Sequence, residues 1–510
     1  MRTVDIIVII LYLIGVALMG WYFSKRNNST EEYFVGSRSY PGWVLGMSML
    51  STSISSFTFL ALPAITFSLD WRQSVPNLIY PLPAIFACIF FIPFFRRANM
   101  ISIYEYLEDR FGPLMRLYGA LSFAIIMTIG QGGSIYLVSI PISFLTGISI
   151  PTVIVISAVA IGLYTITGGI DAVIWTDVIQ GMLLIFGGII ALAVICFKMP
   201  EGFTQIFDVA AAHNKFSFGS MGFSLNERTF WTIAIMGFWG WTAGFASTQQ
   251  FAQRVAAAKS TRESRKALLL SAGLSMPIWG LFLFIGTALF AYYQVNGAGS
   301  IEGMKSDQIF PFFIMTKVPP VIAGLVIAGA LSAAMSTIDS GINSYSAVLV
   351  TDLLKRYLVR YRDEAYYLKA GKVVALLYTM FIIVSGLFFY YFTTESAIDM
   401  IWTISSLLGG CIGAIFITGF FSTRVNYHAA LFALSITLLF NGYLLLVKAK
   451  LLPECISLKL HVYWVGIVIN LCFFVVAYAA SFFFKSAKKD LKGLTVWTLK
   501  AKDDQPESAA

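Results

Sequence analysis

Three stretches of this sequence place polar groups inside otherwise apolar surroundings, and they are where chemistry is expected. Two of them are rich in hydroxyls, and the third combines glycines, aromatic rings and amides. The first is Ser51-Thr52-Ser53-Ile54-Ser55-Ser56-Phe57-Thr58; the second holds Ser332, Ser336, Thr337, Asp339, Ser340, Asn343 and Ser344; the third holds Gly237, Trp239, Gly240, Trp241, Gly244, Phe245, Gln249 and Gln250. One serine in a membrane helix more often packs helices or bonds back to its own backbone. Two dense clusters instead favour a cation site, because hydroxyls and freed backbone carbonyls supply the oxygen ligands of alkali ions.

Two carboxylates lie among the same apolar stretches. Asp177 stands in Trp175-Thr176-Asp177-Val178-Ile179, and Asp339 stands in the second hydroxyl cluster. A charged side chain at the centre of a membrane costs about 3 kcal/mol on insertion scales, so it normally pairs with a cation or takes a proton. We assign every Lys and Arg to a loop or tail. The two aspartates are therefore expected to rely on a bound metal ion or on protonation.

The composition requires a membrane around these groups. The chain has 510 residues, of which 58% are hydrophobic and 12% charged, too few to cover soluble cores of this size. Apolar stretches of spanning length recur along it. Thirteen spans are predicted, at about 4–24, 41–67, 73–95, 115–147, 150–167, 173–198, 227–254, 264–296, 319–355, 365–390, 396–422, 426–447 and 460–485. The first is interpreted as a retained helix, since it has neither a basic leader nor a small-residue cleavage site.

The charge pattern predicts the orientation and excludes some functions. Successive loops lie on opposite sides of the membrane, and the loops of one side hold most of the 35 Lys and Arg residues. The side rich in basic residues is expected to be cytoplasmic, which places the N-terminus outside and the C-terminus in the cytoplasm. The net charge of +9 is spread between apolar segments rather than along one face, so a nucleic-acid partner is not expected. The five cysteines and three histidines show no metal-binding spacing. Short loops favour a bacterial inner membrane, and the oligomeric state is left open.

Two of the predicted spans are expected to be broken helices. Backbone groups cannot go unpaired in lipid, so an interrupted helix survives only where it lines a cavity or lies inside protein. The hydroxyl run in 41–67 and the glycines in 227–254 mark such interruptions, five helices apart, as in two inverted repeats. The whole chain, 1–510, is then one all-α transmembrane domain. Its parts are a leading helix (4–24), two repeats (41–198 and 227–422), two accessory helices (426–485) and a polar, disordered tail (486–510).

Several motifs together resemble the sodium:solute symporter family, whose fold is the LeuT-type 5+5 inverted repeat with broken helices 1 and 6. The pattern is most similar to that of bacterial sodium/sialic acid and sodium/sugar symporters, and it runs from about Tyr33 through the tenth helix of the repeats. It is carried by Glu31-Glu32-Tyr33-Phe34, Ser55-Ser56-Phe57-Thr58-Phe59, Ile92-Pro93-Phe94-Phe95-Arg96, Tyr104-Glu105-Tyr106-Leu107, Gly168-Gly169-Ile170, Ile174-Trp175-Thr176-Asp177, Gln253-Arg254 and the second hydroxyl cluster.

The resemblance implies ion sites. The main sodium site of the family falls on Ser51, Ile54, Ala333, Ser336 and Thr337 here. A second site, found in some members, falls on Asp177, Ser336, Asp339 and Ser340. Asp339 stands where the sialic acid transporters have a serine, so it could strengthen a second sodium site or carry a proton. One or two Na+ ions, and no organic cofactor, are expected.

The solute pocket implied by the resemblance falls on six residues: Ser55, Ser56, Thr58, Asn77, Gln131 and Phe245. The sialic acid transporters have an arginine at the position of Gln131. A buried, unpaired solute carboxylate is expensive, which favours a neutral, hydroxyl-rich solute such as a sugar or polyol, carried with sodium by alternating access. The alternative is sodium-coupled symport of an acid (sialic acid or a monocarboxylate) or another anion, because helix ends can also hold anions. A channel or sensor is a weaker alternative, and no catalytic constellation indicates an enzyme.

Overall fold

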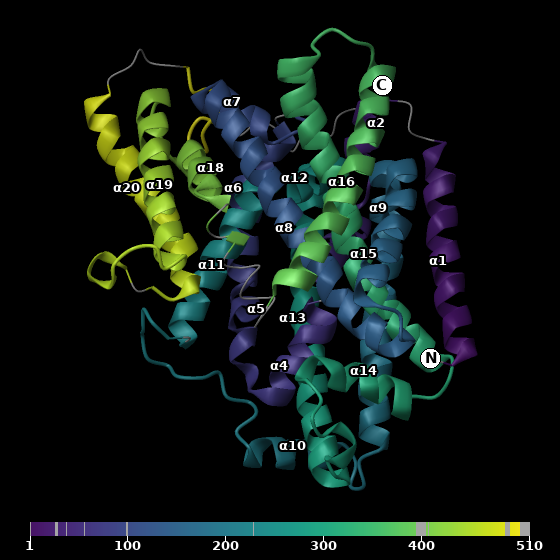
Figure 1. Cartoon of the computed structure of the whole chain (residues 1–510). Helices are drawn as coiled ribbons and strands as arrows, with labels where there is room; N and C mark the ends of the chain where they lie inside the picture. The colour runs from purple at the N-terminus through teal and green to yellow at the C-terminus, as the bar shows by residue number, and fades with distance from the viewer. Residues whose placement is uncertain are drawn as a thin grey trace.

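The computed structural model describes residues 2–25, 29–36, 38–55, 57–97, 100–227, 229–393, 404, 405, 407, 409–458, 460–484 and 490–499. In these ranges the chain is a bundle of helices (Figure 1). The longer helices are α1 (Thr3–Ser24), α6 (Pro81–Arg97), α8 (Pro113–Thr146), α9 (Ile150–Phe197), α11 (Phe230–Ser247), α13 (Thr261–Asn296), α15 (Ile322–Val348), α16 (Glu364–Phe392), α19 (Tyr427–Lys448) and α20 (Val462–Phe483). Shorter helices are α2 (Thr30–Val35), α3 (Gly42–Ser53), α4 (Leu62–Ser68), α5 (Val75–Ile79), α7 (Tyr104–Phe111), α10 (Phe203–Ala212), α12 (Gln249–Ala257), α14 (Ser306–Lys317) and α18 (Ile412–Phe421).

The helix α9 contains two of the predicted spans. A straight helix of its 48 residues would be about 72 Å long, more than twice the thickness of the hydrocarbon layer. Gly169 interrupts it with φ 62° and ψ −159°, a conformation that favours glycine. Tyr164 and Thr176, on either side of this interruption, both bond to the carboxylate of Asp339, so the chain must double back at Gly169. The two arms correspond to the predicted spans 150–167 and 173–198.

The number of spans stays a prediction. Within the described ranges, nine helices are long and apolar enough to cross a membrane, or ten when α3 and the helix after its break count as one span. The kink in α9 and the break between α11 and α12 account for further predicted spans. The predicted span 396–422 is represented by α18, and its first part lies outside the described residues.

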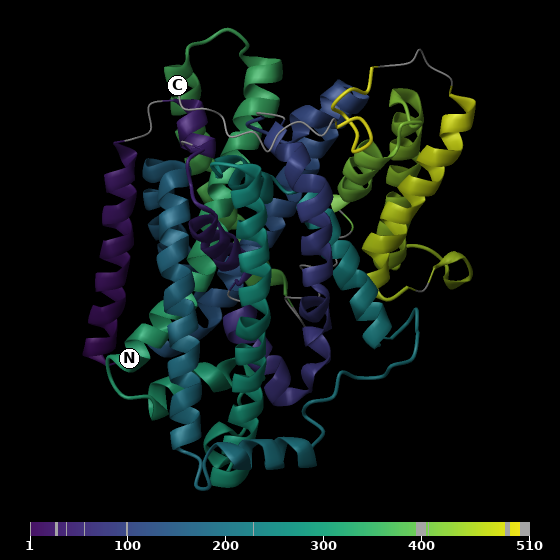
Figure 2. The same cartoon turned by 180° about the vertical axis from the view of Figure 1, so that it is seen from behind.

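The helix α15 is the centre of the bundle. In the most apolar 18-residue stretch of the span that contains α15, 78% is buried inside the protein. The corresponding share in α1, which lies at one edge of the bundle (Figure 2), is 17%. Both arms of α9 and the leading helix α1 pack against α15, while α13 packs against α3 and α4. At Gly286 of α13 a Cβ atom would lie 2.2 Å from the carbonyl oxygen of Pro63, so only glycine allows this close approach. The accessory helices α19 and α20 pair with each other at the opposite edge (Figure 1).

Part of the C-terminal tail is ordered, contrary to the prediction that the tail is disordered. The backbone N–H of Val496 donates to the carbonyl of Phe420 at 2.9 Å, and the indole N–H of Trp497 donates to the carbonyl of Phe421 at 2.7 Å. Thr495 is fully buried. Residues 490–499 therefore pack on the end of α18.

Candidate functional site

The first predicted break lies where the hydroxyl run begins to depart from helical geometry. The helix α3 ends at Ser53, and Ile54 has φ −99° and ψ 87°. A π-helical turn, Phe57–Ala61, leads into α4, and the two halves meet at an angle of 58°. The Ser55 hydroxyl accepts a hydrogen bond from the Phe57 N–H at 3.3 Å and so supports this turn. Ser56 lies outside the described residues.

The residues predicted for the main sodium site come together at this break. The Ser336 hydroxyl lies 3.0 Å from the carbonyl oxygen of Ser51 and 3.4 Å from that of Ala333. The Thr337 hydroxyl lies 3.2 Å from the carbonyl of Ala333 and 3.5 Å from that of Thr52. Ile54 is the buried residue at which α3 stops. Carbonyls at a helix interruption, facing two hydroxyls of α15, form a donor set that fits Na+.

The expectation that no basic side chain reaches the membrane aspartates is wrong. Arg254 on α12 is 1% exposed, and its guanidinium donates to Asp177 Oδ2 at 2.8 Å. The same group donates to the hydroxyls of Ser48, Thr52 and Ser340 at 2.8, 2.7 and 2.5 Å. We had placed Arg254 in a loop because it follows the apolar stretch along the chain. The break before α12 returns it to the interior, where it joins α3, α9, α12 and α15.

Asp339 remains without a basic partner among the described residues. It is fully buried, and its carboxylate accepts hydrogen bonds from the Tyr164 hydroxyl at 2.7 Å and from the backbone N–H of Ser340 at 2.5 Å. Nearby, both amide atoms of the buried Gln180 and Oδ1 of Asp177 have no hydrogen-bond partner in the described structure. When both carboxylates are ionised, the single guanidinium leaves one unit of negative charge. Of the four residues predicted for the second site, Asp177, Asp339 and Ser340 surround this charge, whereas Ser336 faces the Ser51 carbonyl.

The second predicted break opens a cavity beside this network. The helix α11 ends at Ser247, Thr248 is extended (φ −93°, ψ 127°), and α12 begins at Gln249. The cavity has a volume of about 200 Å³ and is lined by Met49, Thr52, Ser53, Tyr80, Trp241, Gly244, Phe245, Thr248, Gln250, Phe251, Arg254 and Leu268. Aromatic faces with a few convergent polar groups are typical of small-molecule sites.

Only Phe245, among the described residues predicted to bind solute, lines this cavity. The Gln131 amide N–H donates to the Thr337 carbonyl at 3.0 Å, which ties α8 to the sodium site, while its Oε1 has no partner in the described structure. Thr58 is buried just beyond the first break, and Asn77 is half-buried on α5. Sequence reasoning missed Tyr80, Gln250 and Arg254 as lining residues. The position of Gln250 and Arg254 beside the glycines of the second break was the available signal.

A model of the family described as "Sodium:solute symporter family" matches residues 33–437. The chain belongs to this family. The match covers both breaks, Asp177, Arg254 and the hydroxyl cluster of α15. Being a member, the chain is a sodium-coupled symporter, and its relatives are transporters rather than enzymes.

Named relatives and a solved structure agree with this assignment. The chain is 34% identical over 432 residues to the sodium/sialic acid symporter SiaT of Proteus mirabilis, covering 84% of this chain and 86% of that one. It is 32% identical over 433 residues to the sodium/sialic acid symporter NanT of Aliivibrio fischeri, covering 84% and 85%. A solved structure described as the substrate-bound outward-open state of a Na+-coupled sialic acid symporter superposes with a TM-score of 0.85 and 29% identity, covering 96% of this chain and 99% of that one. The LeuT-type fold predicted from the sequence is thereby confirmed.

Proposed function

We propose that this symporter carries an acidic sugar of the sialic acid class together with sodium. The observation that supports this most is the likeness to two sodium/sialic acid symporters over 84% of the chain. Arg254 supports it as well, because it lines the cavity and so adds a positive group to a site where we had expected none. This solute was the alternative reading of the sequence. The comparisons give no support to a neutral sugar or polyol.

A neutral, hydroxyl-rich solute remains a second candidate because of two observations. Gln131 offers hydrogen bonds but no charge where the sialic acid transporters have an arginine. Arg254 is already engaged by Asp177, so its charge is only partly available to a solute carboxylate. Phe245, Trp241 and Tyr80 offer ring faces to the apolar side of either solute.

The ions in this proposal occupy two places. One Na+ lies between the Ser51 and Ile54 carbonyls of α3 and Ala333, Ser336 and Thr337 of α15. A second cation lies at Asp339, because burying a net negative charge in the membrane is costly and Arg254 compensates only Asp177. Asp177, Ser340 and Gln180 stand around that position. The proposed stoichiometry is therefore two cations for each solute.

Transport proceeds by alternating access in this proposal. Sodium at the first break favours the arrangement that binds solute, and it can do so only through different affinities for the two states. Each broken helix has one half on the side predicted to be cytoplasmic, α3 in the first and α12 in the second. The hydrogen bonds of Arg254 hold these two halves against α9 and α15. These two halves must move away together for release to the inside. The N-terminus then lies outside and the C-terminus inside, in the inner membrane of a bacterium.

A solute panel tests the proposal. Purified protein in proteoliposomes with an inward sodium gradient is given labelled sialic acid together with an excess of unlabelled sialic acid, a short monocarboxylate, a neutral hexose or a polyol. Saturable uptake that only the acidic sugar suppresses supports the first candidate. Suppression by the neutral hexose or polyol, with no uptake of sialic acid, overturns it in favour of the second.

A further inference from the structure

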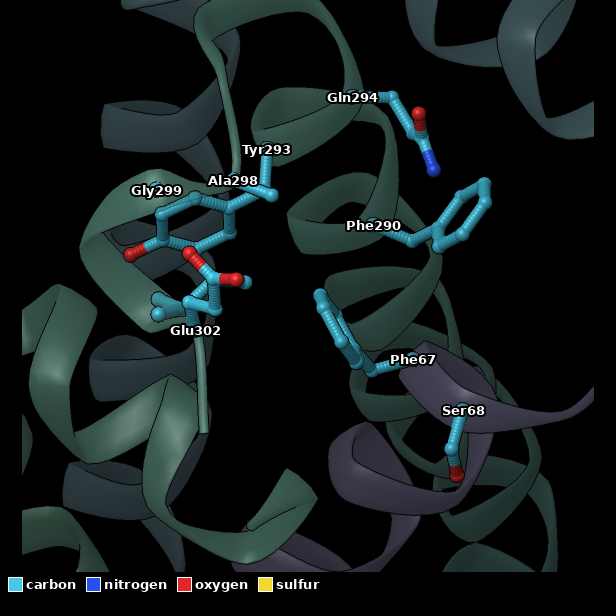
Figure 3. A pocket seen from close by; sticks show the side chains of 9 residues that line it. Phe67, Ser68, Phe290, Tyr293, Gln294, Ala298, Gly299 and Glu302 are labelled. Carbon is cyan, nitrogen blue, oxygen red and sulfur yellow. The ribbon is translucent and has the colours of Figure 1, made fainter. Parts of the chain in front are cut away.

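A cavity larger than the solute cavity lies at the other end of the molecule, near the end at which α1 begins. It has a volume of about 620 Å³ and is formed by the last turn of α4, the last turns of α13 and the segment that follows α13. Figure 3 shows Phe67 and Phe290 on one side of the open space and Tyr293 with Glu302 on the other. By the predicted orientation this end faces the outside. The family comparison assigns nothing to it.

The electrostatics of this cavity favour a positive ligand. Two helices end there, α4 at Ser68 and α13 at Asn296, and the carboxyl end of a helix carries about half a negative charge. At α4 the ammonium of Lys215 compensates this charge by donating to the carbonyls of Phe67 and Leu69 at 2.7 and 2.9 Å. The last turn of α13 contains no basic residue. Glu302 adds an exposed carboxylate, and none of the described residues that line the cavity is basic.

The walls favour an organic cation over a metal ion. The ring centroid of Phe67 lies 6.1 Å from that of Phe290 and 6.4 Å from that of Tyr293, so three aromatic rings cluster here. Ring faces attract ammonium groups. The Lys215 ammonium already lies over one face of Phe290, 3.9 Å from its centroid, so Phe67 and Tyr293 are the rings left for the ammonium of a ligand. The Tyr293 hydroxyl is buried and has no hydrogen-bond partner in the described structure. A Ca2+ or Mg2+ ion would need a shell of oxygen ligands instead.

We infer that this cavity binds a protonated organic amine that carries an apolar group. The ammonium lies between Glu302 and the end of α13, and the apolar group packs on Phe67 and Phe290. The site is separate from the solute cavity, and the carboxylate of Glu302 repels an acidic solute. Binding therefore needs neither sodium nor solute.

Three probes of nearly the same shape and different charge test the site. Binding of 2-phenylethylammonium, 2-phenylethanol and 3-phenylpropanoate to the purified full chain is measured by isothermal titration calorimetry at pH 7.5, with and without sodium. We expect the ammonium to bind at least tenfold more tightly than the alcohol, and the carboxylate to bind most weakly. The affinity for the ammonium should be the same with and without sodium.

Two substitutions locate the probe, and a third is the control. Glu302→Gln should weaken ammonium binding about 1.4-fold to fivefold, the range for one exposed ion pair, and Phe290→Leu should weaken it further. Glu201→Gln removes another exposed carboxylate, one that does not line the cavity, and should change nothing. Equal binding of the alcohol and the ammonium, or unchanged binding in both Glu302→Gln and Phe290→Leu, overturns the inference. Sodium-driven uptake of the solute is unaffected by that result, so the proposed function stands or falls separately.

Discussion

Replacing Arg254 by methionine tests the buried charge network most sharply. Methionine keeps much of the side-chain volume but removes the guanidinium, which makes bonds of 2.5 to 2.8 Å to Asp177, Ser340, Thr52 and Ser48. The Asp177 carboxylate would then be buried without its cation. Removing one partner of a buried ion pair costs about 3–5 kcal/mol, so the variant should lose that much stability in the absence of sodium.

Sodium should restore part of this loss. With Arg254 gone, neither Asp177 nor Asp339 has a basic partner among the described residues, which raises the affinity of the site for a cation. At a sodium concentration one hundred times the dissociation constant, binding stabilises the folded state by about 2.7 kcal/mol. The double variant Asp177→Asn with Arg254→Met removes both charges of the pair. It should therefore lose less stability than Arg254→Met alone and should respond to sodium less.

The assay is thermal unfolding of the purified protein in detergent, over a sodium series at constant ionic strength with choline as the replacement cation. The constant ionic strength separates sodium binding from screening. Unfolding of Arg254→Met at the same temperature as the wild type, without sodium, would refute the account of the pair. Sodium should raise the unfolding temperature of Arg254→Met by more than that of the double variant. An equal or smaller rise would refute the claim that the uncompensated Asp177 carboxylate strengthens sodium binding.

Three further outcomes are expected. Ser336→Ala should raise the sodium concentration for half-maximal uptake at least tenfold, about 1.4 kcal/mol, whereas Ser346→Ala, a buried serine on the same helix, should leave it unchanged in the same uptake assay. Asp339→Asn should lower the number of cations moved per solute from two to one, as measured from the reversal potential of uptake. The Glu108 carboxylate outside the membrane accepts hydrogen bonds from Arg356, and they hold its pKa below the ordinary value. The resulting contact between α7 and the segment after α15 is present near neutral pH and is lost as the pH falls through that lowered pKa. The protection of the α7 amides from hydrogen exchange, relative to the intrinsic exchange rate at each pH, should fall there and should already be lower at pH 7 in Arg356→Gln.

The fold could be predicted from the sequence because its signals are local. Apolar length marks the spans, and the hydroxyl run at Ser51 and the glycines before Phe245 mark the breaks, since each is a property of one stretch of chain. The pairing of Ser51 with Ser336 was implied by the family resemblance, and both clusters offer the same type of ligand. The separation of α9 into the spans 150–167 and 173–198 was predicted from the turn signals between them.

The charge balance of the site could not be predicted in the same way. A count of basic residues by position along the chain assigns Arg254 to a loop, but the break before α12 places the residue against Asp177, on a helix 77 positions away. Nothing local in the sequence shows that the Gln131 amide donates to the Thr337 carbonyl either. Such contacts depend on how distant helices pack, and no single stretch of sequence records them.

Uptake of labelled sialic acid into proteoliposomes, with an inward sodium gradient in one sample and an equal potassium gradient in the other, tests the central claim of sodium-coupled symport. Accumulation above the outside concentration with sodium only, abolished when a sodium ionophore dissipates the gradient, is the predicted result. Equal accumulation with both cations would contradict sodium coupling, whatever the solute.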